Sequence, residues 1–166
     1  MVNARVKRAK SKYFEAEAVK IVEKSPFRGE PKCIHYGTCG GCKWQNMSYE
    51  KQLFFKQDEV ENNIRRIGGI EDFVCEPILG APEQYFYRNK MEFSFSDAKW
   101  LTLDEINSGE EINNKNALGF HIPGMWSKIL DLKECHLQED PSNQIRLAVK
   151  KFADENGLEY FDVRNQ

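Results

Sequence analysis

The sequence predicts an α+β fold, in which a mixed, largely antiparallel sheet is flanked by two helices and joined to a cysteine-rich loop. Three observations predict it. Several short stretches alternate apolar and polar residues with a period of two, as half-buried strands do. Two longer stretches repeat apolar residues at helical spacing. Three cysteines lie close together beside two glycines. With 166 residues, 40% hydrophobic and 30% charged, the chain can bury a core without disulfides.

Residues 4–24 predict two strands. The first is crowded with cations, namely Arg5, Lys7, Arg8, Lys10 and Lys12. In the second, apolar residues at 14, 16 and 18 alternate with Glu15 and Glu17, which is the half-buried strand pattern. Two strands alone are marginal, so we expect them to complete a larger β structure, with the chain beginning partway through a domain. The stretch from Ser25 to Gly29 predicts a linker.

Residues 48–67 predict the first helix. Ser48 is a favourable N-cap, and Glu50 places an acidic residue in the first turn. One helical stripe is apolar apart from Gln57, and its members are Leu53, Val60, Ile64 and Ile67. Gly68 and Gly69 predict the end of this helix.

Three further strands are expected after this helix. Tyr87 to Ser96 alternates Met91, Phe93 and Phe95 with polar residues. Ala117–His121 and Lys128–Lys133 predict two strands joined by a turn at Pro123-Gly124. Residues 101–116 are acidic and rich in asparagine, and they predict a loop or a poor strand pair with a turn near residues 107–109.

The second helix is predicted to begin near Asp140-Pro141, as an N-cap followed by proline at the first helical position. Its predicted apolar face consists of Ile145, Ala148, Val149 and Phe152. Gly157 ends it, and Leu158–Val163 is predicted to be a last strand.

Five cysteines, an odd number in a chain without a secretory signal, favour metal binding or buried thiols over a disulfide framework. Cys33, Cys39 and Cys42 can converge on one centre, because the two intervening glycines let the backbone fold tightly. Cys135 follows a predicted strand and is the natural fourth ligand. Cys75 stands in a short apolar run and predicts a buried strand thiol.

The spacing of these cysteines favours an iron–sulfur cluster, whose four irons each take one thiolate from a different direction. Zinc is the main alternative, although its ligands usually come as two close pairs, and unligated thiols are another. His35 or His136 could replace a cysteine in a zinc site. The radical enzymes that use S-adenosylmethionine need a C-x3-C-x2-C spacing, which differs from the C-x5-C-x2-C found here.

Residues 33–45, with the sequence CIHYGTCGGCKWQ, resemble the cluster loop of the bacterial iron–sulfur RNA uracil-5-methyltransferases, in particular the type that methylates uridine C5 in 23S ribosomal RNA. The order of motifs continues to match in a helix carrying Gln52 and Lys56, in residues 87–90 (YRNK), in residues 118–121 (LGFH) and in residues 129–135 (ILDLKEC). His121 and His136 depart from the family, where arginine and proline are common.

The resemblance implies a domain organisation. Residues 1–26 would be the last strands of a TRAM-like RNA-binding barrel, residues 27–47 a linker and cluster loop, and residues 48–166 a truncated central RNA-recognition domain. The catalytic methyltransferase domain would be absent. No residue here then inherits a catalytic or S-adenosylmethionine-binding role, and Cys75 lacks an adjacent base that would make it a nucleophile.

The implied function is RNA recognition and 4Fe–4S cluster binding within an S-adenosylmethionine-dependent RNA (uracil-C5) methyltransferase that acts on ribosomal RNA. The implied cluster ligands are Cys33, Cys39, Cys42 and Cys135. S-adenosylmethionine would bind only the full-length enzyme, and this chain alone would be inactive. The alternatives are a stand-alone iron–sulfur or zinc module that binds RNA or protein without catalysis, and a redox carrier.

RNA contacts are expected at three places and, in addition, at Phe120 and His121. The cations at positions 5–12 could neutralise phosphates, or could simply keep a strand edge soluble. Residues 87–90 combine groups that can stack on bases, bind phosphate and contact base edges. The alternative is that Tyr87 packs in the core while Arg88 and Lys90 lie in solvent. Lys43 and Trp44 adjoin the cysteine loop, where Trp44 could also cover the cluster. The predicted RNA-binding residues are Arg5, Lys7, Arg8, Lys10, Lys12, Lys43, Tyr87, Arg88, Asn89, Lys90, Phe120 and His121.

The charge distribution is uneven. Residues 1–51 carry a formal charge of +6 and residues 52–166 carry −8. The excess of positive charge in residues 1–51 suggests that one face of the protein binds a polyanion. The alternative is that these charges are spread over solvated surfaces. The acidic 101–116 segment should then face away from RNA. No apolar run reaches the roughly 18–20 residues of a membrane span, so we expect a cytoplasmic protein without a membrane or obligate protein partner.

Overall fold

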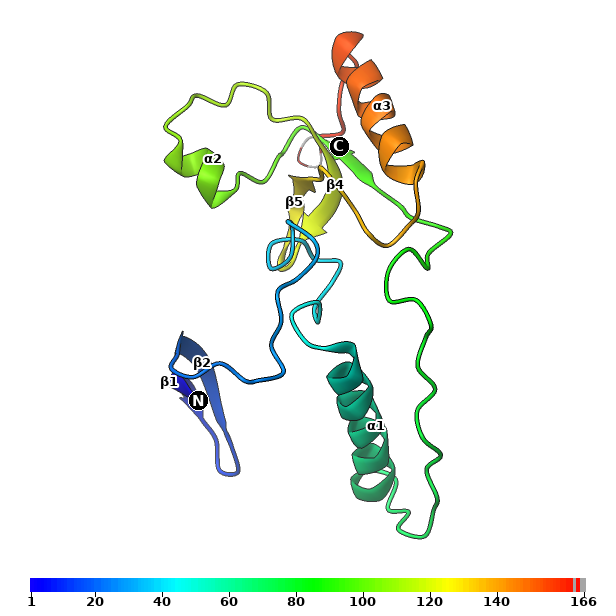
Figure 1. The fold of residues 1–166 in the computed structure, drawn as a ribbon. Coiled ribbons are helices and arrows are strands. Elements are labelled where there is room, and N and C mark those ends of the chain that lie inside the picture. Colours follow the sequence, from blue (N-terminus) through cyan, green and yellow to red (C-terminus); the bar gives the residue numbers. More distant parts are fainter. Residues whose placement is uncertain (163, 165–166) are drawn as a thin grey trace.

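The structure is a computed structural model and describes residues 1–162 and 164. The described chain forms a two-stranded hairpin, a three-stranded antiparallel sheet and three helices (Figure 1), which confirms an α+β fold with antiparallel strands. The elements are β1 (Val2–Ala9), β2 (Phe14–Ile21), α1 (Tyr49–Arg66), β3 (Ser94–Ser96), α2 (Leu103–Asn107), β4 (Ala117–Ile122), β5 (Met125–Asp131) and α3 (Ser142–Glu155).

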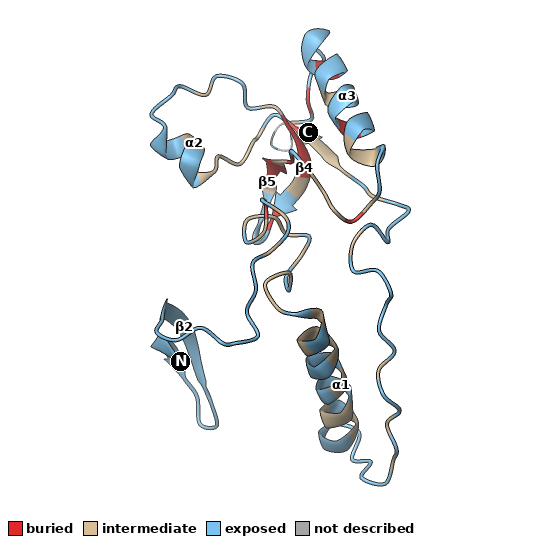
Figure 2. Cartoon of the chain, viewed as in Figure 1, coloured by how far each residue is buried: buried red, intermediate tan, exposed pale blue. Residues whose placement is uncertain are grey.

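The predicted N-terminal strand pair is the hairpin β1–β2, which is antiparallel with two register shifts. Every residue of both strands is exposed (Figure 2). A hairpin that buries neither face has little stability of its own, so its exposed apolar residues Val6 and Phe14 require a partner surface. The TRAM-like barrel stays a prediction.

The core lies in the sheet of order β3–β4–β5. Ile129 and Leu130 are fully buried, and Leu118 of β4 is nearly so. The two strands predicted around Pro123-Gly124 are confirmed, with β5 beginning earlier than expected at Met125. Gly124 has a φ of +76°, which suits the glycine in this turn.

Only the end of the strand predicted over Tyr87–Ser96 forms a ladder, as β3. The chain at the start of this stretch pairs elsewhere. The amides of Phe86 and Arg88 donate to the carbonyls of His136 and Leu137, both at 2.8 Å. Residues 86–88 therefore join the chain just after Cys135 instead of β4.

The first helix was predicted correctly. Ser48 is the N-cap of α1, although its side chain makes no capping hydrogen bond, and the helix ends before Gly68. Its predicted apolar stripe is only partly covered, with Leu53 half-buried and Ile67 82% exposed. Gln57, the polar member of that stripe, has a structural use, because its Oε1 accepts the Ile78 amide at 2.9 Å.

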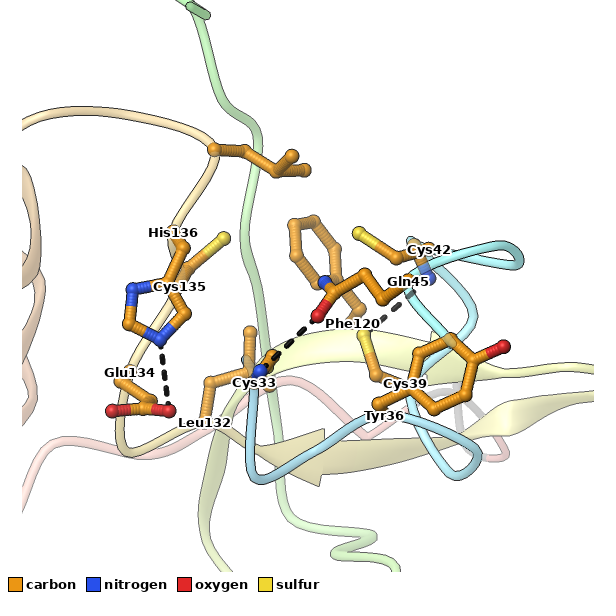
Figure 3. Close-up of a pocket in the computed structure, with 12 residues that line it drawn as sticks. Cys33, Tyr36, Cys39, Cys42, Gln45, Phe120, Leu132, Glu134, Cys135 and His136 are labelled. Atoms are coloured by element: carbon orange, nitrogen blue, oxygen red, sulfur yellow. Dashed lines mark hydrogen bonds and ion pairs between the residues drawn. The ribbon is translucent and has the colours of Figure 1, made fainter. Parts of the chain in front are cut away.

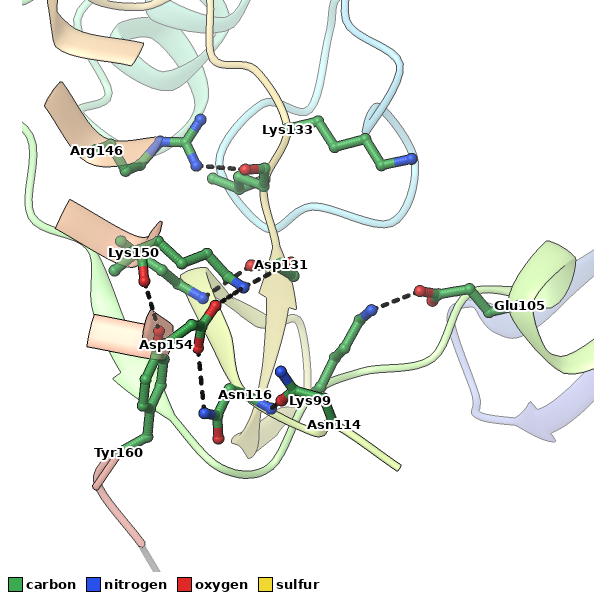
Figure 4. A network of polar contacts seen from close by, with 12 residues as sticks. Lys99, Glu105, Asn114, Asn116, Asp131, Lys133, Arg146, Lys150, Asp154 and Tyr160 are labelled. Atoms are coloured by element: carbon green, nitrogen blue, oxygen red, sulfur yellow. Dashed lines mark hydrogen bonds and ion pairs between the residues drawn. The ribbon is translucent and has the colours of Figure 1, made fainter. Parts of the chain in front are cut away.

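The predicted face of α3 is wrong. Ile145, Val149 and Phe152 are exposed, whereas Arg146 and Ala153 are buried. The inward side is polar because its groups bond to β5 and the residues after it. Arg146 donates to the Leu132 carbonyl, and the Lys150 ammonium lies 3.6 Å from the Asp131 carboxylate (Figure 4).

The start of α3 also differs from the prediction, since Pro141 and not Asp140 is the N-cap and Ser142 is the first helical residue. The predicted end at Gly157 is confirmed by its φ of +60° and by the Leu158 amide, which donates to the Ala153 carbonyl at 2.9 Å.

Three further expectations need correction. Residues 103–107 of the acidic segment, predicted as a loop or a poor strand pair, form α2, because Thr102 and Glu105 make a reciprocal capping box. Cys75 is half-buried and lies outside any strand. Residues 158–162 of the predicted last strand are irregular, and Val163 lies outside the described residues.

Among the described residues, none of the helices combines the length and the hydropathy that a membrane span requires.

Gly119→Ala is expected to destabilise the protein by roughly 3 kcal/mol, because the new Cβ would overpack the sheet. It would lie 2.0 Å from the Leu130 carbonyl oxygen, so β4 and β5 would have to separate. Gly29→Ala is the matched control, since its Cβ would meet nothing within 4 Å. Urea denaturation of both variants measures the difference, and equal midpoints would contradict this account of the sheet.

Candidate metal centre and nucleic-acid groove

Four of the five cysteines line one pocket (Figure 3). Cys33, Cys39 and Cys42 come from the loop, and Cys135 comes from the chain after β5. The space among the lining residues is about 370 Å³, part of it open to solvent. Phe120, Leu132 and Leu137 supply apolar walls, so the thiols meet in a mostly dry environment.

The cysteine loop is folded by its own backbone. The Tyr36 amide donates to the Cys33 carbonyl at 3.1 Å, and the Cys39 amide donates to the His35 carbonyl at 2.9 Å. The Gly41 amide points at the Cys39 sulfur, 3.4 Å away. At Gly40 a Cβ would lie 2.9 Å from the His121 carbonyl oxygen, so only glycine permits this close approach to β4.

Two polar contacts tie the loop to the end of β5. The Lys133 amide donates to His35 Nε2 at 2.9 Å, and the Ile34 amide donates to Glu134 Oε1 at 3.2 Å. Burial lowers the pKa of His35, which keeps its imidazole neutral and able to accept. The Ile34 amide is the main reason that the pKa of Glu134 is lowered. These contacts bring Cys135 to the other three cysteines.

Burial raises the pKa of the Cys33, Cys39 and Cys135 thiols, and neighbouring cysteines raise it further. A bound cation would oppose this effect, since thiols ligate metals as thiolates and lose their protons on binding. Four thiolates without a bound cation are therefore unfavourable in this pocket, and a cationic centre would stabilise them.

The pocket brings together four sulfur donors of the kind that both iron–sulfur clusters and zinc ions use. In the part of the chain that the structure describes, no group of three or more histidine, cysteine or acidic side chains is placed to hold one metal ion. Four thiolates bound to four separate irons stand further apart than four ligands of one ion. The four cysteines that line the pocket, with the Gly41 amide 3.4 Å from the Cys39 sulfur, are the residues that could hold such a cluster.

The two histidines considered as zinc ligands have other partners. His35 Nε2 accepts the Lys133 amide, and His136 Nε2 lies 3.0 Å from Glu134 Oε1. The His136 ring also packs edge-on against Tyr85 and Phe86. Both side chains hold the pocket wall together.

A second, larger hollow adjoins the cysteine pocket and shares Gly41, Cys42, Gln45 and Leu137 with it. We call it the groove. It spans about 1520 Å³ including open solvent, between the cysteine loop, the first turns of α1 and residues 81–88. Its wall carries four aromatic side chains and three cations against one carboxylate, which belong to Trp44, Tyr49, Tyr85, Tyr87, Lys43, Lys56, Arg88 and Glu83.

Side chains of α1 hold the groove wall through hydrogen bonds and through one contact between a cation and an aromatic ring. Gln52 Nε2 donates to the Trp44 and Met47 carbonyls at 3.1 and 3.0 Å. The Tyr49 hydroxyl accepts the Ala81 amide at 2.7 Å, and the Lys56 ammonium lies 5.7 Å from the centre of the Trp44 ring. An aromatic wall with cations above it can stack unpaired bases and bind their phosphates.

The chain bends sharply at Phe86, whose φ is +58°. A non-glycine residue rarely adopts this conformation unless its surroundings hold it. Here the Phe86 amide donates to the His136 carbonyl, and the Lys32 ammonium lies 4.7 Å from the Phe86 ring centre. The bend directs Tyr87 and Arg88 into the groove wall.

The structure brings only some of the predicted RNA-binding residues together. Lys43, Tyr87 and Arg88 line the groove. Phe120 and Lys90 border a neighbouring hollow with Arg88, although Lys90 also pairs with Glu92 at 2.7 Å. Asn89 is exposed. His121 borders another hollow, where its Nδ1 contacts the Trp126 carbonyl.

None of the five cations of the hairpin lines the groove, and the hairpin itself lies away from α1 (Figure 1). All are exposed. Lys7 pairs with Glu17 at 2.8 Å, and Lys10 pairs with Glu15 at 3.3 Å across the hairpin. Arg5, Arg8 and Lys12 form no ion pair with an acidic side chain within the described chain, so the hairpin offers a second cationic surface.

Tyr49, Lys56 and Tyr85 were missed as candidate site residues. A sequence signal existed for the first two, because Tyr49, Gln52 and Lys56 follow an i, i+3, i+7 spacing that places them on one face of α1. Tyr85 carried no such signal, since its position depends on the bend at Phe86.

His35→Leu is expected to cost roughly 1–3 kcal/mol in unfolding free energy, because it leaves the Lys133 amide without its acceptor. The Lys133 amide should also exchange its hydrogen faster. Ile34→Ala is the control, since that side chain is 66% exposed and its removal should leave stability nearly unchanged. Unchanged protection of the Lys133 amide in His35→Leu would show that this contact does not tie the loop.

No family model matches the chain. Similar proteins are nevertheless found across its whole length. The chain is 50% identical over 166 residues to a protein of Bacteroides thetaiotaomicron, and 44% and 40% identical over 164 and 169 residues to proteins of Chlorobaculum tepidum and Porphyromonas gingivalis.

These matches cover 100%, 98% and 97% of the chain but 37%, 34% and 36% of the three relatives, so the chain spans about a third of the length of the curated relatives it matches. Each relative is named an uncharacterized RNA methyltransferase. The chain that carries the cysteine pocket and the groove is therefore similar to one part of proteins that bear the name RNA methyltransferase.

Proposed function

We propose that this chain is the RNA-recognition and iron–sulfur-binding part of an S-adenosylmethionine-dependent RNA (uracil-C5) methyltransferase that acts on ribosomal RNA in the cytoplasm. The observation that carries the proposal is that four thiols share one pocket and that this pocket adjoins a groove rich in aromatic and cationic side chains. The names of the relatives support the methyltransferase part, and the cysteine motif supports the uridine-specific type.

In this proposal Cys33, Cys39, Cys42 and Cys135 hold a 4Fe–4S cluster. When bound, the cluster joins two segments far apart in sequence and so constrains the unfolded chain. Its role is structural. It fixes the cysteine loop, which forms one side of the groove, to the segment that follows β5. That segment in turn holds residues 85–88, because its carbonyls accept the Phe86 and Arg88 amides.

The groove is proposed to bind unpaired RNA. Trp44, Tyr85 and Tyr87 offer ring faces for bases, and Lys56 and Arg88 offer charge for phosphates. Single-stranded RNA is favoured over duplex RNA because stacking on aromatic side chains requires exposed bases.

Methyl transfer is assigned to parts of the protein outside these 166 residues. The relatives are about three times longer than this chain. Cys75, the remaining thiol, is half-buried on an irregular segment, and it is not proposed as the nucleophile. The isolated chain is expected to bind RNA without methylating it.

Anaerobic purification is expected to yield about four irons and four sulfides per chain, with a broad visible absorption. Cys135→Ser should lower the iron content, because it removes the ligand supplied by the chain after β5. Cys75→Ser is the matched control, since Cys75 does not line the pocket. One zinc and no sulfide in the wild-type protein would overturn the cluster assignment.

Arg88→Gln and Tyr87→Ala are each expected to weaken binding of a uridine-rich single-stranded RNA, roughly tenfold for the tyrosine. Arg88→Gln should also reduce the salt dependence of binding by about one counterion. Fluorescence anisotropy at several salt concentrations measures both effects. Lys151→Gln on α3 is the control, and iron content verifies that the pocket is intact. Equal affinities for all four proteins would place the RNA site elsewhere.

A further inference from the structure

The peptide of Cys135 is held by one side chain of α3. Asn143 Oδ1 accepts the Cys135 amide at 2.9 Å, and Asn143 Nδ2 donates to the Cys135 carbonyl at 2.9 Å. Cys135 lies beyond the end of β5, where no strand partner satisfies its backbone among the described residues. The Asn143 side chain thus makes the two hydrogen bonds that a neighbouring strand would make, one with the amide and one with the carbonyl of Cys135.

Arg146 holds the same segment one helical turn further on. Its Nη2 donates to Asn143 Oδ1 at 3.3 Å, and its Nη1 donates to the Leu132 carbonyl (Figure 4). Residues 132–135 are thereby held at both ends. The side chains of Asn143 and Arg146, called here the Asn143–Arg146 pair, act on the segment that carries Cys135.

The burial of Arg146 needs an explanation beyond these hydrogen bonds. Its residue is only 4% exposed, and its buried Nε finds no hydrogen-bond partner in the described chain. Placing a guanidinium here leaves the apolar residues Ile145 and Val149 of the same helix in solvent. A buried cation is costly unless an anion compensates it.

The acidic groups that act on Arg146 are the Cys135 thiol and the Asp131 carboxylate, and Asp131 lies 3.6 Å from the Lys150 ammonium. The guanidinium also lies over the Phe93 ring, 5.4 Å from the ring centre. Burial lowers the pKa of His35, and the guanidinium together with Lys133 lowers it further. Cys135 is therefore the acidic group left for Arg146. A cluster held by four thiolates is an anion as a whole, so it would supply the missing counter-charge.

We propose that Asn143 and Arg146 are positioning residues for the cluster: Asn143 aims Cys135 as the fourth thiolate, and Arg146 sets a buried positive charge against the anionic centre. The inference rests on the proposed cluster. If α3 positions Cys135 and the cluster, the burial of its polar side against the sheet is explained.

Asn143→Ala tests the aiming of Cys135. A misplaced fourth thiolate leaves one iron weakly held, so ferricyanide should convert the variant readily. In that step the 4Fe–4S core in its 2+ state loses one Fe²⁺ and passes one electron to ferricyanide, which leaves a 3Fe–4S core in its 1+ state. Electron paramagnetic resonance detects the product. The exposed neighbour change Gln144→Ala is the control and should behave as the wild-type protein does.

Arg146→Gln and Arg146→Lys test the charge. Removal of the cation should shift the midpoint potential of the cluster to a more negative value, because the added electron is no longer compensated. Arg146→Lys keeps the charge and should keep most of the potential, and Lys151→Gln removes an exposed charge from the same helix as a control. A purely structural role of Arg146 would change unfolding without changing the potential.

The outcomes separate this inference from the proposed function. If the wild-type protein holds no iron and sulfide, the proposed cluster fails. If it holds the cluster but Asn143→Ala resists ferricyanide as the wild-type protein does, the pair does not position Cys135. Should Arg146→Gln not fold, Arg146→Met takes its place as the variant that removes the charge. A wild-type potential in that variant, together with an Asn143→Ala cluster that resists ferricyanide, would overturn the inference.

Discussion

The convergence of the cysteine loop on the end of β5 is the constraint on which the rest of this structure depends. Two backbone amides establish it, those of Lys133 and Ile34, which donate to His35 and Glu134. Both contacts cross about a hundred residues of sequence, and each satisfies a group that would otherwise lack a partner. Without them Cys135 would not share a pocket with the other cysteines, and the groove would lose one side.

The groove illustrates how a binding surface can form from segments that have little stability of their own. The helix α1 has no buried residue, and the segment from 70 to 90 runs back along it without regular structure (Figures 1 and 2). Side-chain hydrogen bonds from Gln57 and Tyr49 keep the two together. A surface held by a few polar contacts can adapt to a flexible nucleic-acid strand, whereas the sheet of β3, β4 and β5 remains fixed.

The helix α3 buries polar side chains that contact the segment carrying Cys135, and it exposes apolar side chains as a result. Its apolar residues could have packed on the sheet, yet Asn143, Arg146 and Lys150 occupy that side and leave Ile145 and Phe152 exposed. Polar groups buried with their partners specify one arrangement better than apolar packing does, because any other arrangement leaves them unsatisfied. This preference fits a helix whose task is to hold Cys135 in one place.

The sequence by itself determined most of the local elements and which thiols meet in one pocket. The turn at Pro123-Gly124 between two strand-like stretches predicted β4 and β5, and glycines predicted the ends of α1 and α3, because these signals depend on near neighbours. The close spacing of three cysteines, with Cys135 after a predicted strand, singled out the four thiols that line one pocket. Only the tertiary structure decided which face of α3 is buried, that residues 86–88 pair beyond Cys135, and that Tyr49 and Lys56 join Tyr87 in one groove. These outcomes depend on hydrogen bonds between distant residues, which no local period encodes.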